Sequence, residues 1–185
     1  MYCYPGKSNY RGGDIISGMV ATELYKKDGI SVFFDIGTNG ELVVGNREFL
    51  LCGAGAAGPA LEGGVVRTGM RAAEGAVESV RLTEKGFELG VIGGGEARGI
   101  CGSGIIELLA ELFLAGWIDL RGKFVPEKNK AIRKVDGMYA VEYAPGLFFF
   151  PSDGDEFLRT KAAAATMVEN MLSETGNGTV EISDF

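Results

Sequence analysis

Three short apolar runs separated by polar turns mark the first third of the chain. The run at 31–36 is apolar except for Ser31 and Asp35, and further runs follow at 41–45 and 49–52. Asn and Gly residues between the runs favour tight turns between neighbouring antiparallel strands. The pattern therefore predicts a three-stranded antiparallel meander.

Two segments on either side of the middle of the chain have the apolar spacing of an amphipathic helix. The first covers about 14–27, with Asp14 as its N-cap and two lysines near its C-terminal end. The second covers about 103–115, with Ser103 as its N-cap and Gly116 as the residue that stops it. In both, the cap is expected to satisfy N–H groups of the first helical turn.

The longest helical pattern lies near the end of the sequence. It covers about 155–174, after a cap at Asp153, and a further strand begins near 180–182. The apolar positions of this helix predict one buried stripe, made of Phe157, Leu158, Ala162, Ala165, Val168, Met171 and Leu172.

Weaker strand patterns fill the middle of the chain. Residues 77–82 and 87–92 are expected to pair as a second hairpin, and residues 128–143 are strand-like. We assign residues 1–12 to an N-terminal loop and 122–150 to an excursion from the main body. Strands alternating with helices in this order predict an α/β fold with a mixed sheet.

Composition excludes several classes of protein. The 185 residues suit one compact domain, and a hydrophobic content of 46% excludes disordered and collagen-like chains. The absence of His excludes Ser-His-Asp catalysis and His-ligated zinc within the chain. Three Cys without a CxxC pair exclude an iron–sulfur cluster, and their odd number, with no signal peptide, indicates reduced thiols and a cytoplasmic protein.

Net charge and hydropathy restrict the classes of partner that the chain is expected to bind. The net charge of −7 argues against nucleic acid as a partner. No apolar run reaches the roughly 18 residues that a membrane-spanning helix needs, so no membrane span is expected.

Glycine is the most unusual feature of the composition. The chain has 30 Gly, against about 13 for an average sequence of this length. Eighteen of them lie between Gly37 and Gly104. Such a concentration indicates loops that approach a ligand closely or need left-handed backbone conformations.

A phosphate-binding turn is one interpretation of the sequence DIGTNGE at 35–41. Asp35 ends an apolar strand, where a carboxylate is costly unless a partner or a cation compensates it. The loop that follows offers backbone N–H groups and polar side chains, from Gly37, Thr38, Asn39 and Gly40. Such a loop can hold phosphate, and the carboxylate can position Mg²⁺ or water. An ordinary Asn-Gly hairpin remains the alternative.

Two further Gly-rich strings contain candidate site residues. Glu62 stands between glycines in AGPALEG at 57–63, where it either contacts a ligand or is simply solvated. The string GICGSG at 99–104 leads directly into a helix, so N–H groups near Gly102 and Ser103 can face an anion. A tight strand-to-helix connection with a plain Ser cap is the alternative.

One string at 53–58 fits the dinucleotide-binding pattern GxGxxG. That pattern requires a long helix directly after the glycines. Pro59, Gly63 and Gly64 leave room for only about one turn, which disfavours dinucleotide binding.

These strings in this order resemble the ATPase domain of the reductive activators of corrinoid proteins, within the actin, sugar-kinase and heat-shock-70 superfamily. The resemblance covers about 10–185 and rests on five strings. They are DIGTNGE at 35–41, AGPALEG at 57–63, GMRA at 69–72, GICGSG at 99–104 and RTKAA at 159–163. The resemblance implies that residues 1–185 form one ribonuclease-H-like lobe of an actin-like fold, which begins with the meander.

The resemblance also implies a function. The family couples ATP hydrolysis to the transfer of an electron from an iron–sulfur domain to cob(II)alamin, which gives cob(I)alamin. ATP, Mg²⁺ and a corrinoid protein are then the expected cofactors and partners. Asp35 and Glu62 become the candidate catalytic residues, and Asp35 becomes the candidate metal ligand. The candidate nucleotide-binding residues are Gly37, Thr38, Asn39, Gly40, Gly102 and Ser103.

Parts of the family pattern are not found in this sequence. A first lobe with its own DxGT loop and an iron–sulfur domain are both missing, so we expect a fragment that is inactive alone. The sequence leaves open whether the protein forms a homodimer. Two alternative functions also remain at this point: a small-molecule kinase of the same superfamily, or a non-catalytic lobe that docks a corrinoid protein.

Overall fold

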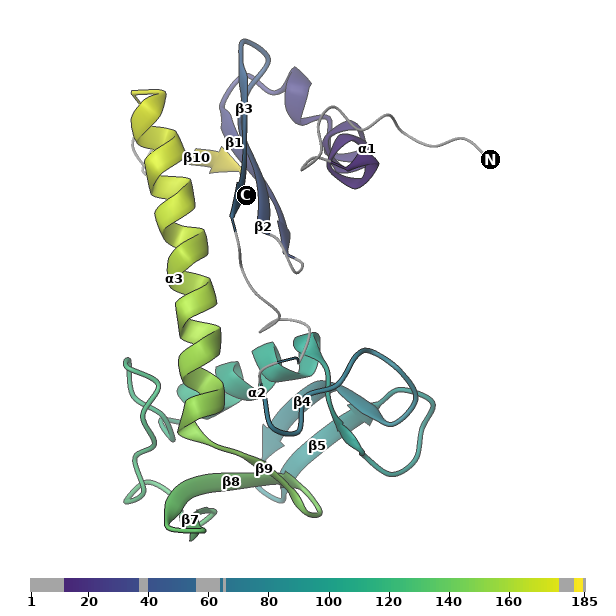
Figure 1. Ribbon diagram of the computed structural model, residues 1–185, viewed down its shortest axis with the longest axis vertical. Helices are drawn as coiled ribbons and strands as arrows, with labels where there is room; N and C mark the ends of the chain where they lie inside the picture. Colours follow the sequence, from purple (N-terminus) through teal and green to yellow (C-terminus); the bar gives the residue numbers. More distant parts are fainter. Residues whose placement is uncertain (1–11, 37–39, 56–63, 65, 177–181, 185) are drawn as a thin grey trace. The chain divides into compact units, whose positions relative to one another are not determined.

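A computed structural model describes residues 12–36, 40–55, 64, 66–176 and 182–184 (Figure 1). The chain divides into two compact units. Unit 1 comprises residues 1–57 and 161–185, and unit 2 comprises residues 58–160. The expectation of one lobe over residues 1–185 stays a prediction, and each unit is described by itself below.

A four-stranded mixed sheet forms the centre of unit 1. Its strands are β1 (Ile30–Ile36), β2 (Gly40–Gly45), β3 (Leu50–Gly55) and β10 (Ile182–Asp184), in the order β10-β1-β2-β3. The first three pair antiparallel, which confirms the predicted meander. β10 pairs parallel with β1, so the strand predicted near 180–182 is also confirmed.

The alternation of side chains along β2 builds two cores, one on each face of this sheet. Leu42 and Val44 face the C-terminal part of helix α3 (Pro151–Glu174), where they pack with Val168, Met171 and Leu172. Val43 faces the opposite way, toward the helix α1 (Gly13–Thr22), and packs with Ile15 and Leu24. The two helices therefore cover opposite faces of the sheet (Figure 1).

The N-terminal helix is shorter than the sequence predicts. α1 ends before Glu23, whose left-handed backbone (φ 52°) breaks the helix, and a 3-10 turn, η1 (Leu24–Lys26), follows. The break brings Leu24 into the core, where it is 2% exposed. Asp14 is not the N-cap, because Gly12 holds that position and the Asp14 carboxylate accepts from the neighbouring N–H of Ile15.

The first two glycines of the GxGxxG string allow a helix to pack closely against a strand. Gly53 and Gly55 lie within β3 and not in a loop. A Cβ at Gly53 would lie 2.8 Å from the sulfur of Met171, and one at Gly55 would lie 3.1 Å from that of Met167. Glycine thus allows the methionines of α3 to approach the β3 backbone closely.

Unit 2 contains two three-stranded sheets. The first has the order β5-β4-β6, from β4 (Ala76–Thr83), β5 (Gly86–Val91) and β6 (Gly99–Ile100). The second is antiparallel, with the order β7-β8-β9, from β7 (Ile132–Val135), β8 (Met138–Ala144) and β9 (Leu147–Phe149). The predicted hairpin and the strand-like character of 128–143 are confirmed.

The helix α2 (Gly102–Leu114) lies over the first sheet of unit 2. Its Ile105, Leu108 and Leu112 are completely buried in a core shared with Val77 and Phe149. Gly116, at φ 69°, follows its end, as predicted.

α3 begins four residues earlier than predicted. Pro151 occupies its first position, which suits a residue without an N–H. Asp153 is therefore not the N-cap but a residue of the first turn, and its carboxylate accepts from the N–H of Phe150 at 2.9 Å. The predicted stripe is confirmed at Val168, Met171 and Leu172, but Ala162 and Ala165 are exposed.

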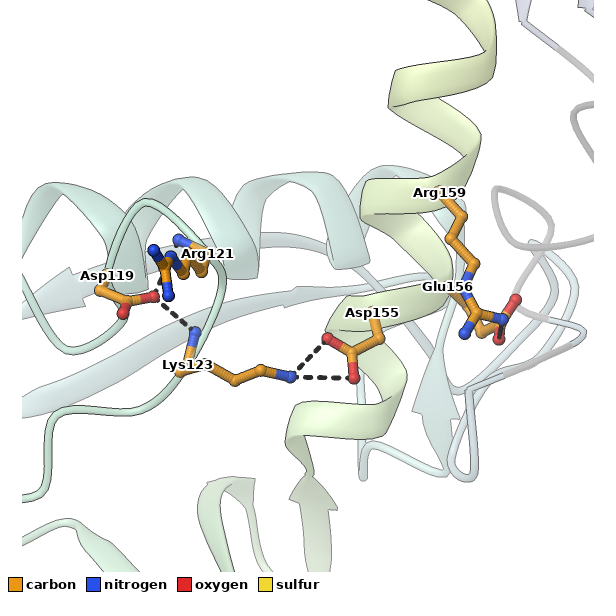
Figure 2. A network of polar contacts seen from close by, with 6 residues as sticks. All are labelled: Asp119, Arg121, Lys123, Asp155, Glu156 and Arg159. Atoms are coloured by element: carbon orange, nitrogen blue, oxygen red, sulfur yellow. Dashed lines mark hydrogen bonds and ion pairs between the residues drawn. The ribbon is translucent and has the colours of Figure 1, made fainter.

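Polar contacts join the start of α3 to the loop that follows α2 (Figure 2). The Asp119 carboxylate accepts from the backbone N–H groups of Arg121 and Lys123, and these bonds hold the pKa of Asp119 below its usual value. The Lys123 ammonium group then pairs with Asp155 at 2.8 Å.

In the described part of the chain, no helix is both long and apolar enough to cross a membrane.

Candidate functional site

Asp35 and Gly40 lie at one end of the β1–β2 hairpin in unit 1. In the antiparallel register Asp35 stands opposite Glu41, and Ile36 stands opposite Gly40. Asp35 is half-buried and Gly40 is buried. The three residues between these strands, Gly37, Thr38 and Asn39, lie outside the described residues.

Carboxylates gather at this end of the hairpin. Burial raises the pKa of Glu41, and the negative charges of Asp35 and then Asp14 raise it further. Like charges directly opposite each other in a sheet are destabilising, so the Asp35–Glu41 pair is a poor choice for stability alone. No group of three or more acidic, Cys or His side chains that could hold a metal ion is found among the described residues. A single carboxylate with neighbouring oxygens suits a hydrated Mg²⁺, which usually keeps several waters.

Glu62 lies outside the described residues. The segment 66–70 of unit 2 lies against Ile100. Ile100 donates its N–H to the carbonyl of Thr68 and accepts from the N–H of Met70, both at 2.9 Å. Gly69 forms a parallel bridge with Ile100. The strings GMRA at 69–72 and GICGSG at 99–104, which are about 30 residues apart in sequence, therefore lie side by side.

The N-terminus of α2 differs from the prediction in its cap. Cys101 holds the N-cap position and Gly102 is the first helical residue. Ser103 is not the cap, because its hydroxyl donates to the carbonyl of Glu78 at 2.8 Å. Helix geometry leaves the N–H groups of the first turn, which contains Gly102 and Ser103, without intrahelical acceptors, and the helix dipole is positive there. The backbone at this point thus suits an anion.

Gly104 fixes how closely α2 approaches the sheet. A Cβ at this position would lie 2.3 Å from the carbonyl oxygen of Val77 and 2.8 Å from a side-chain carbon of Ile100. Cys101 is 3% exposed, and its sulfur lies 3.4 Å from the same carbonyl. Part of the GICGSG string therefore serves the tight connection between strand and helix.

A buried polar cluster supports the segment 66–70, and the sequence analysis missed it. The Asp153 carboxylate, 2% exposed, accepts from the N–H of Arg67 at 3.3 Å, and the Arg67 guanidinium lies 4.2 Å from the ring centre of Phe150. The Tyr143 hydroxyl donates to Thr68 at 2.8 Å, and burial raises the pKa of Tyr143 to about 12. No local pattern marks these residues, because their partners lie up to 86 positions apart.

Comparison with known proteins identifies the family. Residues 29–185 match the family described as the C-terminal domain of RACo, the ASKHA domain. The chain belongs to this family. Membership in the RACo C-terminal family confirms the expected actin-like α/β fold, whose meander, crossover helix α3 and parallel β10 are seen in unit 1.

Two proteins that activate corrinoid proteins, according to their names, are similar to this chain. The corrinoid activation enzyme RamQ of Eubacterium limosum is 37% identical over 121 residues, which are 65% of this chain and 20% of RamQ. A solved structure of a reductive activator for corrinoid, iron-sulfur protein is 38% identical, with a TM-score of 0.82. The match covers 98% of this chain and 31% of that structure. This chain thus spans about a fifth to a third of these relatives.

The candidate residues fall into two groups within this family fold. Asp35 and Gly40 lie at the hairpin end of unit 1, and Gly102 and Ser103 lie at the start of α2 in unit 2. The role of each group in binding a nucleotide stays a prediction.

Proposed function

We propose that this chain is part of an ATP-dependent reductive activator of corrinoid proteins. Its membership in the RACo C-terminal family over residues 29–185 supports this, together with the names of both relatives. The whole protein would transfer one electron from a reduced iron–sulfur cluster to cob(II)alamin of a corrinoid protein, giving cob(I)alamin. Since the three Cys of this chain are scattered, the cluster belongs to a domain outside these 185 residues.

Each group of candidate site residues has a distinct role in this proposed function. Asp35 would hold Mg²⁺ and orient the attacking water, and the backbone N–H groups of Gly37, Thr38, Asn39 and Gly40 would bind phosphate oxygens. Glu62 is the second candidate carboxylate for water activation. In unit 2, the first turn of α2 at Gly102 and Ser103 would offer N–H groups to phosphate. Hydrolysis of ATP would supply the free energy for the conformational change that makes the electron transfer possible.

The task of Asp35 is tested in the full-length protein by the substitution Asp35→Ala. Steady-state hydrolysis of Mg-ATP should be abolished, because Asp35 is the candidate ligand of Mg²⁺ and Ala offers no oxygen in its place. Reduction of cob(II)alamin, followed by its visible absorption, should be lost in parallel.

Asp28→Ala is the matched control. Asp28 lies in the same unit, and its carboxylate forms an exposed ion pair with Arg47 at 2.7 Å. This variant should keep wild-type ATP turnover. If Asp35→Ala also hydrolyses ATP at the wild-type rate, Asp35 has no part in the mechanism.

A further inference from the structure

β4 loses its strand neighbour after its first two residues. β6 pairs with β4 only at Ala76 and Val77. A bulge in the β4–β5 register follows, between Val77 and Ser79. From Glu78 onward, β5 occupies one edge of β4, and the other edge has no strand among the described residues.

Side chains of α2 take the place of that missing strand. The Ser103 hydroxyl donates to the carbonyl of Glu78 at 2.8 Å. The Glu107 carboxylate accepts from the N–H of Val80 at 2.7 Å, and that of Glu111 accepts from the N–H of Leu82 at 3.1 Å. We call Ser103, Glu107 and Glu111 the α2 ladder.

The ladder fits because the two repeats match. Its three residues are four positions apart on the helix, which corresponds to a rise of about 6.0 Å. Their partners on β4 are two positions apart, which corresponds to about 6.6–6.8 Å. Successive side chains of α2 therefore reach successive outward-facing backbone groups of β4. The adjoining side of α2, with Leu108 and Leu112, is buried in the core and keeps the helix in place.

An unpaired strand edge is a ready template for pairing with another chain. After the bulge, residues 79–83 of β4 contain no Lys and no Pro, and Arg81 is their one charged residue. An open groove of about 560 Å³, lined by Arg81, Glu88, Glu107 and Glu111 among others, runs beside the ladder, so this edge is accessible from solvent.

We propose that the α2 ladder closes the edge of β4 against strand addition, and that without it this edge pairs antiparallel with β4 of a second copy. The sequence of β4 suits such pairing. With Val80 opposite Val80, Glu78 stands opposite Leu82 and Ser79 opposite Arg81, so apolar positions stay on one face and no like charges meet.

The test replaces both carboxylates, in Glu107→Ala/Glu111→Ala, and compares the chain with wild type. Amide exchange at Val80 and Leu82 should be about tenfold faster in dilute solution, as expected from the loss of a hydrogen bond to a charged group. Size-exclusion chromatography with light scattering should show additional association as concentration rises. The amides of Val80 and Leu82 should regain their protection in the associated form.

Two matched variants separate this effect from charge and from misfolding. Glu74→Ala/Glu96→Ala removes the same charge from exposed positions of unit 2 and should behave as wild type. Glu107→Gln/Glu111→Gln keeps an acceptor oxygen at both positions and should remain closed. If the double Ala variant does not fold, judged by Trp117 fluorescence, Glu111→Ala alone should show faster exchange at Leu82.

Three results would overturn the proposal. One is unchanged exchange at Val80 and Leu82 in the folded Ala variant. Another is the absence of additional association at any concentration. The third is association that leaves these two amides unprotected, since a different surface would then be responsible.

Discussion

The strongest stability prediction concerns Asp153→Ala. Asp153 is 2% exposed, and its carboxylate is bonded to the N–H groups of Phe150 at 2.9 Å and Arg67 at 3.3 Å. The first bond satisfies the start of α3, and the second attaches the segment 66–70 to it. Alanine removes both acceptors and leaves no polar atom in their place.

The expected loss of stability follows from these two hydrogen bonds. Loss of a polar group that satisfies a helix N-terminus costs about 0.5–2 kcal/mol. An N–H left buried without an acceptor costs about 1–3 kcal/mol. The two values overlap, because the N–H of Phe150 contributes to both. We therefore expect the free energy of unfolding of unit 2 to fall by about 2 kcal/mol.

Trp117 makes the measurement specific to unit 2. It is the single Trp of the chain and is buried in the core of that unit. In urea unfolding followed by its fluorescence, a slope of about 1–2 kcal/mol/M converts the loss into a midpoint lower by about 1–2 M.

Asp155→Ala is the matched control for this measurement. It removes a carboxylate two positions further along α3, where the side chains of the pair Lys123 and Asp155 are 54% and 41% exposed. Exposed pairs contribute at most about 1 kcal/mol, so its midpoint should change little. Equal midpoints for Asp153→Ala and Asp155→Ala would refute the reasoning.

Two further predictions concern the same unit. Burial raises the pKa of Asp153 in the folded chain, so ionisation of this carboxyl opposes folding. The favourable contribution of protonated Asp153 to the free energy of unfolding is therefore present at low pH and is lost as the pH rises through the folded-state pKa. The free energy of unfolding of wild type relative to Asp153→Asn should therefore increase between pH 7 and pH 4 in urea titrations, and a difference that is constant with pH would contradict this. Gly104→Ala should lower the free energy of unfolding by about 1–3 kcal/mol despite the better helix propensity of Ala, because its Cβ would lie 2.3 Å from the Val77 carbonyl oxygen. Gly154→Ala, also in a helix of this unit, is the control, because its Cβ would lie no closer than 3.6 Å to the side chains that pack against it, and a Gly104→Ala variant as stable as wild type would contradict the steric argument.

The strands were predictable because their pattern is local. The consecutive apolar residues 42–44 lie alternately on two buried faces, and both faces are filled by residues that the helical patterns also marked as apolar. The Gly-rich strings located the hairpin end at Asp35 and the start of α2 for the same reason: each lies at the end of an apolar strand.

The starts of the helices were not predictable, because distant contacts decide them. Ser103 has the chemistry of an N-cap, but its hydroxyl is used by the carbonyl of Glu78, 25 positions away. Asp153 has the same chemistry and is instead shared between Phe150 and Arg67. The pairing of Ile100 with Thr68 and Met70 likewise depends on the fold and leaves no trace in either string.

The close approach of α3 to β3 has a chemical consequence. The sulfurs of Met167 and Met171 lie directly against Gly53 and Gly55, at distances that a single Cβ would already make too short. Oxidation of a thioether to the sulfoxide would add a polar oxygen to this closely packed apolar contact. The packing of unit 1 thus requires reduced methionines, so exposure to peroxide would weaken the sheet that carries Asp35 before it altered Asp35 itself.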